Sequence, residues 1–384
     1  MEHFEDASAA ERALINRASE QRIPINASIE LLPLCNMNCD MCYVRLSRAE
    51  MEKQGRLRTA EEWLSVARQM RDGGTLFLLL TGGEPLIYPD FRRLYLALRE
   101  LGFLITINTN GTLIDEDWAA FFGVHKPRRI NITLYGADEQ AYESLCHYPG
   151  GFARVTRGVR LLREQGVEVK LAGSMTPQNV KDLDRLFTVG RELDVPVHID
   201  TYMMPAERER SLPFDMQARL SPEDAARARV RSFFLLSGRA GLLEFASKHL
   251  WMAEHLPEPE LPNRMTCLAG SCSYTINWQG QMRPCVVMTS PAADVFELGF
   301  DAAWKKIRKE ADEIILSDVC AACKMRPLCR TCAASALLET GSYDGVPEYM
   351  CRYTKETYRQ LAGFCMHEMQ RRRRNGEEAE DGKE

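Results

Sequence analysis

The sequence has no long apolar stretch: no uninterrupted hydrophobic run exceeds five residues, as in Leu76–Leu80. A membrane-spanning helix needs about 20 consecutive apolar residues, so no transmembrane segment is predicted. The first 22 residues lack the basic start and the apolar core of a secretory signal. The net charge is −5 and no basic stripe is present, so nucleic-acid binding is not expected. We expect a cytoplasmic protein.

Cysteine, in contrast, is abundant, with 13 residues in a chain of 384. Disulfides are rare in a reducing cytosol, where closely spaced cysteines more often bind metal; disulfides remain the alternative. Most of the cysteines fall into two groups. The first group is Cys35, Cys39 and Cys42, and the second is Cys267, Cys272, Cys285, Cys320, Cys323, Cys329, Cys332 and Cys351. This division predicts two kinds of metal site.

Short β-branched or apolar segments alternate with helical patterns through the first half of the chain, which is typical of βα units around a parallel sheet. The expected strands cover residues 28–34, 75–80, 103–108, 129–135, 167–173 and 197–201. The expected helices cover residues 59–72, 90–101, 115–122, 151–165 and 179–193. We therefore predict an α/β fold, a partial (β/α)6 barrel of the TIM type that is two units short of closure.

The pattern changes after residue 202, where a connection leads into a helical stretch at about 221–251. Three prolines within residues 256–263 indicate a linker. Beyond it cysteines dominate, so we expect a small domain that metal stabilises. The expected divisions are a helical extension at 1–27, the barrel at 28–202, a helical connection at 203–262, the cysteine-rich domain at 263–356, and a helix with a charged tail at 357–384.

The first three cysteines are spaced C-x3-C-x2-C, directly after the first expected strand, and Tyr43 follows them. Three thiolates are one fewer than a 4Fe-4S cluster normally takes from protein, which leaves one iron open. Structural zinc, the alternative, normally needs four ligands. The spacing and the aromatic residue resemble the motif of the radical S-adenosylmethionine (SAM) enzymes. The resemblance implies that the open iron binds SAM, which is cleaved to a 5′-deoxyadenosyl radical.

Further matches fall at the carboxyl ends of expected strands, where parallel-sheet enzymes place their sites. Residues 82–85 resemble the GGEP element of the family: two glycines let the backbone approach a ligand, and the glutamate can pair with an ammonium group. Residues 108–112 and 132–136 resemble segments that contact SAM, although Asn-Gly is also a common turn. The implied SAM-binding residues are Tyr43, Gly82, Gly83, Glu84, Pro85, Asn108, Asn110, Thr133 and Tyr135, with Gly111, Met175 and Asn179 at the same mouth.

The eight later cysteines allow two zinc sites by spacing alone. Their order, with Gly280-x4-Cys285 and C-x2-C-x5-C-x2-C, resembles the SPASM extension of radical SAM enzymes, which carries two auxiliary 4Fe-4S clusters. The resemblance implies that Cys267, Cys272, Cys285 and Cys332 hold the first auxiliary cluster, and Cys320, Cys323, Cys329 and Cys351 the second. Both would then be fully ligated, with a role in electron transfer or structure. Two features depart from the family pattern: the last pair of the central run has spacing x2 where the family often has x3, and the gap from Cys272 to Gly280 is short.

Two cysteines stand outside both groups, Cys146 and Cys365. Isolated cysteines are usually buried as small apolar residues, which is the expectation for both. Cys146 follows the fourth strand on the side of the site, so a catalytic thiol is the alternative there, with His147 and Tyr148 beside it as hydrogen-bond or proton donors. No other catalytic residue is assigned.

Enzymes with this extension commonly modify peptides or proteins, so the resemblance implies hydrogen abstraction from a peptide or protein substrate. Cys285 is followed by Val286 instead of the aspartate of sulfatase-maturing enzymes, which disfavours a sulfatase substrate. One alternative is the modification of a small molecule such as a tetrapyrrole. Another is a non-catalytic iron–sulfur electron carrier or zinc scaffold.

The implied partners are the peptide or protein substrate and a flavodoxin- or ferredoxin-type electron donor. Only about 28 residues precede the first expected strand, too few for a domain that captures a leader peptide as an added strand. We therefore expect that the barrel itself or a separate leader-recognition protein holds a peptide substrate.

Overall fold

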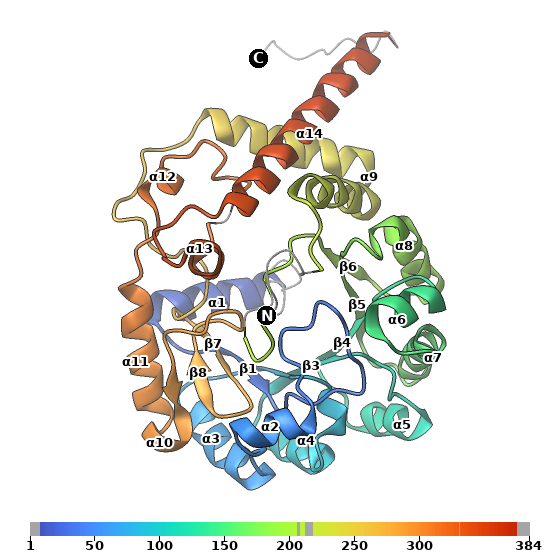
Figure 1. Ribbon diagram of the computed structural model, residues 1–384, viewed down its shortest axis with the longest axis vertical. Coiled ribbons are helices and arrows are strands. Elements are labelled where there is room, and N and C mark those ends of the chain that lie inside the picture. The colour runs from blue at the N-terminus through green and yellow to red at the C-terminus, as the bar shows by residue number, and fades with distance from the viewer. Residues whose placement is uncertain (1–7, 206–207, 212–217, 330, 375–384) are drawn as a thin grey trace.

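The structure is a computed structural model that describes residues 8–205, 208–211, 218–329 and 331–374. Within these residues a curved sheet runs in the order β6-β5-β4-β3-β2-β1-β7-β8-β9, with helices along its outer side (Figure 1). The strands are β1 (Asn26–Glu30), β2 (Phe77–Thr81), β3 (Leu104–Thr109), β4 (Arg129–Thr133), β5 (Val169–Ser174), β6 (Val197–Asp200), β7 (Ser273–Ile276), β8 (Gln281–Arg283) and β9 (Ala293–Asp294). Neighbouring strands from β6 to β7 are parallel, and β8 and β9 are antiparallel.

The helices of the barrel lie close to their predicted positions, and the partial α/β barrel is confirmed. The helices are α1 (Ala9–Gln21), α2 (Arg48–Gln54), α3 (Ala60–Asp72), α4 (Phe91–Glu100), α5 (Glu116–Val124), α6 (Glu139–Cys146), α7 (Gly151–Glu164), α8 (Leu183–Glu192), α9 (Pro222–Glu254), α10 (Val295–Leu298), α11 (Phe300–Asp312), α12 (Asp318–Ala321), α13 (Ala333–Thr340) and α14 (Glu348–Arg374). The sequence did not predict α2 and α6, because helices of only two turns show little periodicity.

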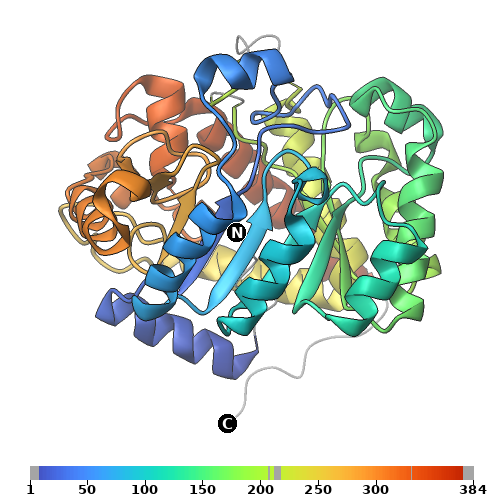
Figure 2. The same cartoon turned by 90° about the horizontal axis from the view of Figure 1, so that it is seen from below.

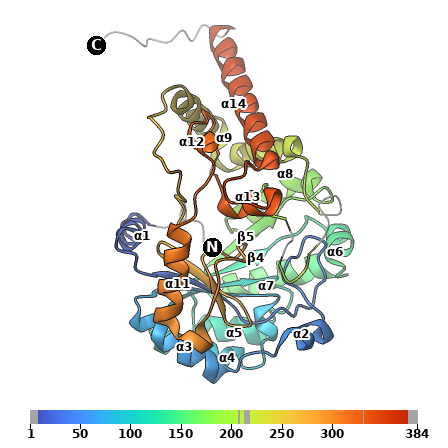
Figure 3. The ribbon, with the colours of Figure 1, turned by 60° about the vertical axis from the view of Figure 1, so that its left-hand side comes forward.

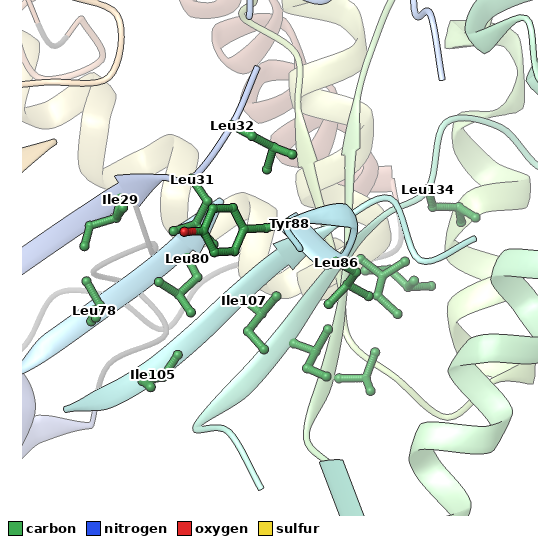
Figure 4. Packing of buried hydrophobic residues seen from close by; sticks show 14 of the residues in the cluster. Ile29, Leu31, Leu32, Leu78, Leu80, Leu86, Tyr88, Ile105, Ile107 and Leu134 are labelled. Carbon is green, nitrogen blue, oxygen red and sulfur yellow. The ribbon is translucent and has the colours of Figure 1, made fainter. Parts of the chain in front are cut away.

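The outer face of the barrel strands is apolar. Figure 4 shows Ile29, Leu78, Leu80, Ile105 and Ile107 on the same side of three neighbouring strands. All five are almost completely buried in the main core, together with side chains of α3 and α4. Burial of such side chains stabilises the fold by about 1.5–3 kcal/mol each, so this face fixes which residues point inward.

The inner face, which holds the residues that alternate with the apolar outer ones, is mostly polar, with Leu79 of β2 as an apolar exception. Strand register places its residues side by side: Ser28 and Glu30 on β1, Thr106 and Asn108 on β3, Arg129 and Asn131 on β4, Lys170 on β5, Thr275 on β7 and Arg283 on β8. Parallel strands buried on both faces usually carry apolar residues on both. A polar inner face therefore marks the interior of this barrel as a place for polar ligands.

The cysteine-rich region begins as a continuation of the barrel sheet. β7 pairs with β1, and the hydroxyl groups of Tyr274 and Thr75 are 2.8 Å apart. Tyr274 packs against Phe300 and Trp304 of α11 within the main core. Residues 273–312 therefore share the apolar core of the barrel, whereas the sequence predicted a domain that metal alone stabilises. Strands of two to four residues are too short to show an alternating pattern.

Two further helical contacts complete the fold. α1, drawn in deep blue, lies across the amino ends of the strands (Figure 2), where Ile15 and Ala18 pack on Phe77. α9 bends at Gly238, which has φ 70°, and packs against α14 (Figure 3). Cys365 is buried in that contact, as expected of an isolated cysteine. In the part of the chain that the structure describes, no helix combines the length and the apolar character that a membrane span requires.

Candidate active site

Cys35, Cys39 and Cys42 lie in the loop that follows β1 at the carboxyl edge of the sheet. Their thiols are close enough for each charge to influence the others. Burial raises the pKa of Cys35 to about 12 and also raises the pKa of Cys42. Buried thiolates need a compensating cation, which an iron–sulfur cluster provides.

The arrangement of the thiols also fits a cluster. Among the described residues, no three His, Cys, Asp or Glu side chains converge on a point that one metal ion could occupy. A 4Fe-4S cluster does not need such convergence, because each cysteine binds a different iron. The lack of a single-ion site among the described residues is therefore compatible with the cluster that the sequence predicts.

Gly82 and Gly83 hold the end of β2 against the start of the cysteine loop. The amide of Gly83 donates to the carbonyl of Leu32 at 2.7 Å, and the amide of Glu84 donates to the carbonyl of Leu34 at 2.9 Å. A Cβ atom on Gly83 would lie 2.1 Å from the Leu34 carbonyl oxygen. Gly82 has φ 134°, which favours glycine. The backbone of the cysteine loop itself thus requires both glycines.

Glu84 is fully buried and joins the ends of β2 and β3. Its Oε1 accepts hydrogen bonds from the Leu86 amide at 3.1 Å and the Thr109 hydroxyl at 2.8 Å, and its Oε2 accepts one from the Asn110 amide at 2.8 Å. Burial raises the pKa of this carboxyl group to about 7. In this structure Glu84 orders the strand ends, and Pro85 begins the 3-10 turn (Pro85–Ile87) that follows.

Asn110 reaches the cysteine loop directly. Its amide nitrogen lies 3.6 Å from the Cys35 sulfur and 2.8 Å from Oδ1 of Asn36. The Asn36 amide donates in turn to the Thr112 hydroxyl at 2.9 Å. The segment after β3, where Gly111 has φ 75°, therefore serves as a support for the triad in this structure.

Cys146 also lies beside the triad, at the end of α6. Its carbonyl accepts a hydrogen bond from the Asn38 amide at 3.1 Å. The Cys146 thiol is fully buried and donates to the Cys39 sulfur, which lowers the pKa of Cys39 and raises that of Cys146. The Tyr135 hydroxyl also contacts Cys39. Cys146 is thus buried, as expected, but next to the site.

The neighbours of Cys146 have separate contacts. His147 lies 2.7 Å from Asp40 through Nε2 and Oδ1, so α6 contacts the cysteine loop through a side chain as well. Tyr148 instead lies beneath Arg154, 5.9 Å from ring centre to guanidinium carbon.

The other predicted SAM-contacting residues occupy different settings. Asn108 accepts a hydrogen bond from the Asn131 amide at 2.9 Å on the inner face, and Thr133 ends β4 on the same face. Asn179 is fully buried and donates to the carbonyls of Tyr135 and Ser174, at 2.8 and 3.0 Å. Asn179 and the fully buried Met175 thus belong to the core beneath the strand ends.

Three charged residues that the sequence did not single out enclose the loop from the other side. Arg208 lies 5.2 Å from the ring centre of Tyr43 and is paired with Glu30. Arg210 donates to the Cys39 carbonyl at 2.9 Å. A glutamate among the mostly apolar residues 28–34 is the one signal that could have indicated this network.

In the cysteine-rich region the structure brings together all four predicted ligands of the second auxiliary cluster. The charges of Cys320, Cys323 and Cys351 all act on Cys329. Burial is the main cause that raises the pKa of Cys329 to about 11. This four-thiol group also fits a cluster.

The predicted ligands of the first auxiliary cluster are not all together. The Cys267 thiol interacts with those of Cys285 and Cys332. Cys272 is fully buried elsewhere, with its sulfur 3.9 Å from the Ile15 carbonyl of α1. The structure thus gathers three of these four cysteines.

The chain is similar to curated proteins along much of its length. The chain is 24% identical over 336 residues to an AdoMet-dependent heme synthase of Methanosarcina barkeri, over 82% of this chain and 92% of that protein; AdoMet is SAM. It is 29% identical over 162 residues to an Fe-coproporphyrin III synthase of the same species, over 42% of this chain and 40% of that protein.

Solved structures have the same fold. SuiB of Streptococcus suis bound to S-adenosylmethionine matches 89% of this chain and 81% of its own, with a TM-score of 0.63 and 17% identity. Native anSMEcpe with bound AdoMet and the Kp18Cys peptide matches 90% of this chain and 99% of its own, with a TM-score of 0.66 and 18% identity. Likenesses at this identity concern the fold alone.

The family model described as "Radical SAM superfamily" matches residues 29–188, which run from the end of β1 through the cysteine triad and past β5. Members of this superfamily use a 4Fe-4S cluster and SAM, which are the cofactors of this protein. Residues 29–188 of the chain are therefore a radical SAM domain.

Proposed function

We propose that this radical SAM enzyme acts on a tetrapyrrole, a macrocycle with carboxylate side chains, held inside the barrel. The observation that carries the proposal is Arg283. Register with Thr275 places it on the inner face, and its buried Nε has no hydrogen-bond partner among the described residues. A partly buried guanidinium with an unused donor favours a carboxylate ligand.

Other cations share this inner face. Lys170 of β5 is only 5% exposed and pairs with Asn131 of β4. Arg129 lies two residues before Asn131 on β4, on the same face of the sheet. Positive side chains from three strands suit a substrate with several carboxylates. The near full-length similarity to a heme synthase supports the same substrate class, which the sequence had left as the alternative to a peptide.

The chain's own residues have two proposed tasks in this reaction. Cys35, Cys39 and Cys42 hold the cluster, while the burial of their loop keeps water from the site. Asn108, Thr133 and the backbone at Gly82 and Gly83 line the edge where SAM binds. When bound, the cluster and SAM supply a 5′-deoxyadenosyl radical, which takes a hydrogen atom from the substrate.

The cysteine-rich region is proposed as a SPASM-type domain that holds auxiliary 4Fe-4S clusters. Its support is the grouping of Cys320, Cys323, Cys329 and Cys351 in one place and of Cys267, Cys285 and Cys332 in another. A flavodoxin- or ferredoxin-type protein is the proposed electron donor.

A peptide or protein substrate is the second candidate. The observation that favours it is the fold's likeness to SuiB and anSMEcpe, because solved structures of these proteins contain a precursor peptide and the Kp18Cys peptide. A separate leader-recognition protein is a proposed partner only if the substrate is a peptide.

One experiment separates the two. The anaerobically reconstituted protein is incubated with SAM and dithionite, either with Fe-coproporphyrin III or with synthetic peptides encoded beside its gene, and 5′-deoxyadenosine and substrate mass are measured. We expect Fe-coproporphyrin III to increase 5′-deoxyadenosine and to lose mass. Cys35→Ala should abolish both effects, while Cys365→Ala, far from the site, should leave them unchanged. Turnover with peptides alone would establish the second candidate.

A further inference from the structure

Cys272 has the surroundings of a core residue. It is completely buried, and Ile15, Ala18, Ile25 and Phe77 belong to the same apolar cluster. Its sulfur lies 3.9 Å from the Ile15 carbonyl oxygen. Every one of these contacts lies at the amino ends of β1 and β2, beneath α1.

The strand that follows fixes this orientation. The Cys272 carbonyl accepts a hydrogen bond from the Asn26 amide at 3.0 Å, which continues the pairing of β7 with β1. Side chains alternate along a strand, so Cys272 shares a side with Tyr274 and Ile276, both in the main core. Turning Cys272 to the other side needs a one-residue slip, which would expel both of those side chains from the core.

Two of the other three cysteines, Cys285 and Cys332, lie on a different apolar cluster. Cys285 and Cys332 pack against Met288, Ile314 and Leu316, and Met265, two residues before Cys267, packs there too. The Cys267 thiol interacts with both Cys285 and Cys332. This is a three-thiol group, in contrast to the group of four thiols that Cys329 forms with Cys320, Cys323 and Cys351.

We propose that Cys267, Cys285 and Cys332 alone hold the first auxiliary cluster and that Cys272 is a core residue. One coordination position of that cluster is then open to a ligand that is not a protein thiolate, namely an oxygen or nitrogen donor such as a substrate carboxylate. The inference rests on the proposed function, because it takes the cysteine-rich region to hold auxiliary clusters. It replaces the fully ligated cluster that the sequence predicted.

Iron counting on the reconstituted full chain tests the ligand set. The wild type should bind about twelve irons, for three 4Fe-4S clusters. Cys272→Ala and Cys272→Ser should also bind about twelve, whereas Cys267→Ala should bind about eight. Circular dichroism shows whether each variant is folded. If Cys272→Ala does not fold, Cys272→Ser, whose hydroxyl lies beside Ser19 and Ser271, replaces it in the test.

A spectroscopic measurement tests the open position. SAM at saturation occupies the open iron of the first site, and 13C-cyanide is then added to the reduced protein. We expect a 13C hyperfine coupling in the wild type and an equal one in the Cys272 variant. Loss of about four irons in the folded Cys272 variants, or no coupling in the wild type, would overturn the inference. A wild type with only about four irons would overturn the auxiliary clusters of the proposed function as well, so the two failures are distinguishable.

Discussion

Arg208 and Glu30 form a buried, bidentate ion pair. Nη1 and Nη2 of Arg208 donate to Oε1 and Oε2 of Glu30 at 2.8 and 2.7 Å, and both side chains are 2% exposed. Nη1 also donates to the carbonyl of Val286 at 2.7 Å, next to Cys285. One guanidinium thus connects the strand that precedes the cysteine triad with the residue after Cys285 in the C-terminal region.

Arg208→Met should lower the free energy of unfolding by about 3–5 kcal/mol, because it leaves the buried carboxylates of Glu30 and Glu209 without this partner. Urea denaturation of the metal-free protein measures the change. The matched control is Lys305→Met, which breaks an exposed pair with Asp301 at 2.6 Å and should cost less than about 1 kcal/mol. Equal losses in the two variants would contradict the structural role of Arg208.

Gly83→Ala should disrupt the first cluster, because its Cβ would lie 2.1 Å from the Leu34 carbonyl oxygen, one residue before Cys35. The reconstituted variant should lose about four of its irons and the electron paramagnetic resonance signal that responds to SAM. Gly363→Ala is the control, since a Cβ at this position in α14 meets no atom within 4 Å. Full iron content in Gly83→Ala would show that the loop tolerates displacement.

Glu84 should make stability depend on pH. Burial raises the pKa of its carboxyl group to about 7, whereas an unfolded glutamate has a pKa of about 4.3. The folded state therefore retains a proton that the unfolded state releases, so stability is greatest at low pH and falls as pH rises between these values. From pH 5 to pH 8 the free energy of unfolding should fall by about 2–3 kcal/mol more in the wild type than in Glu84→Gln. Urea denaturation measures these free energies. An equal change with pH in the wild type and in Glu84→Gln would refute the assignment.

The sequence predicted the features whose cause is local. An apolar run such as residues 76–80 must be buried, and alternating βα units leave few other folds, so strands and helices of the barrel were found within a few residues. The sequence indicated the triad and the two glycines because each of these motifs lies within a few neighbouring residues. Gly83 shows the limit of such a match: its closest neighbour is the Leu34 carbonyl, which no spacing indicates.

The sequence did not predict features that depend on the direction of a side chain or on a long-range contact. Cys272 and Cys267 are equally plausible ligands by spacing, but only the pairing of β7 with β1 places Cys272 beneath α1. The Arg208 and Glu30 pair joins residues 178 positions apart, and no local pattern records such a contact. Long-range pairing of short strands is therefore where the sequence-based prediction of ligands was weakest.

Cys146→Ala should retain the first cluster, although Cys146 contacts Cys39. The carbonyl that accepts from the Asn38 amide is unchanged by the substitution, so the loop stays in place and the iron content should equal that of the wild type. Only the thiol hydrogen bond is lost, and the reduction potential of the cluster should become more negative, because hydrogen bonds to ligand sulfurs raise it. Redox titration followed by electron paramagnetic resonance measures the potential. Cys39→Ala, the comparison, should lose the cluster; iron loss in both would make Cys146 a ligand.

Arg283→Met should weaken the binding of a carboxylate-bearing tetrapyrrole. A hydrogen bond to a charged group contributes about 1.5–3 kcal/mol, which corresponds to about 10- to 100-fold in Kd. Titration of Fe-coproporphyrin III followed by its visible absorbance measures the affinity, with Lys305→Met as a variant that loses a positive charge on the surface. Because burial lowers the pKa of Arg283, its charge is costly in the free protein, and a carboxylate that pairs with it offsets this cost. Unchanged affinity in Arg283→Met would mean that this arginine of the barrel serves another ligand, and the tetrapyrrole assignment would lose its main structural support.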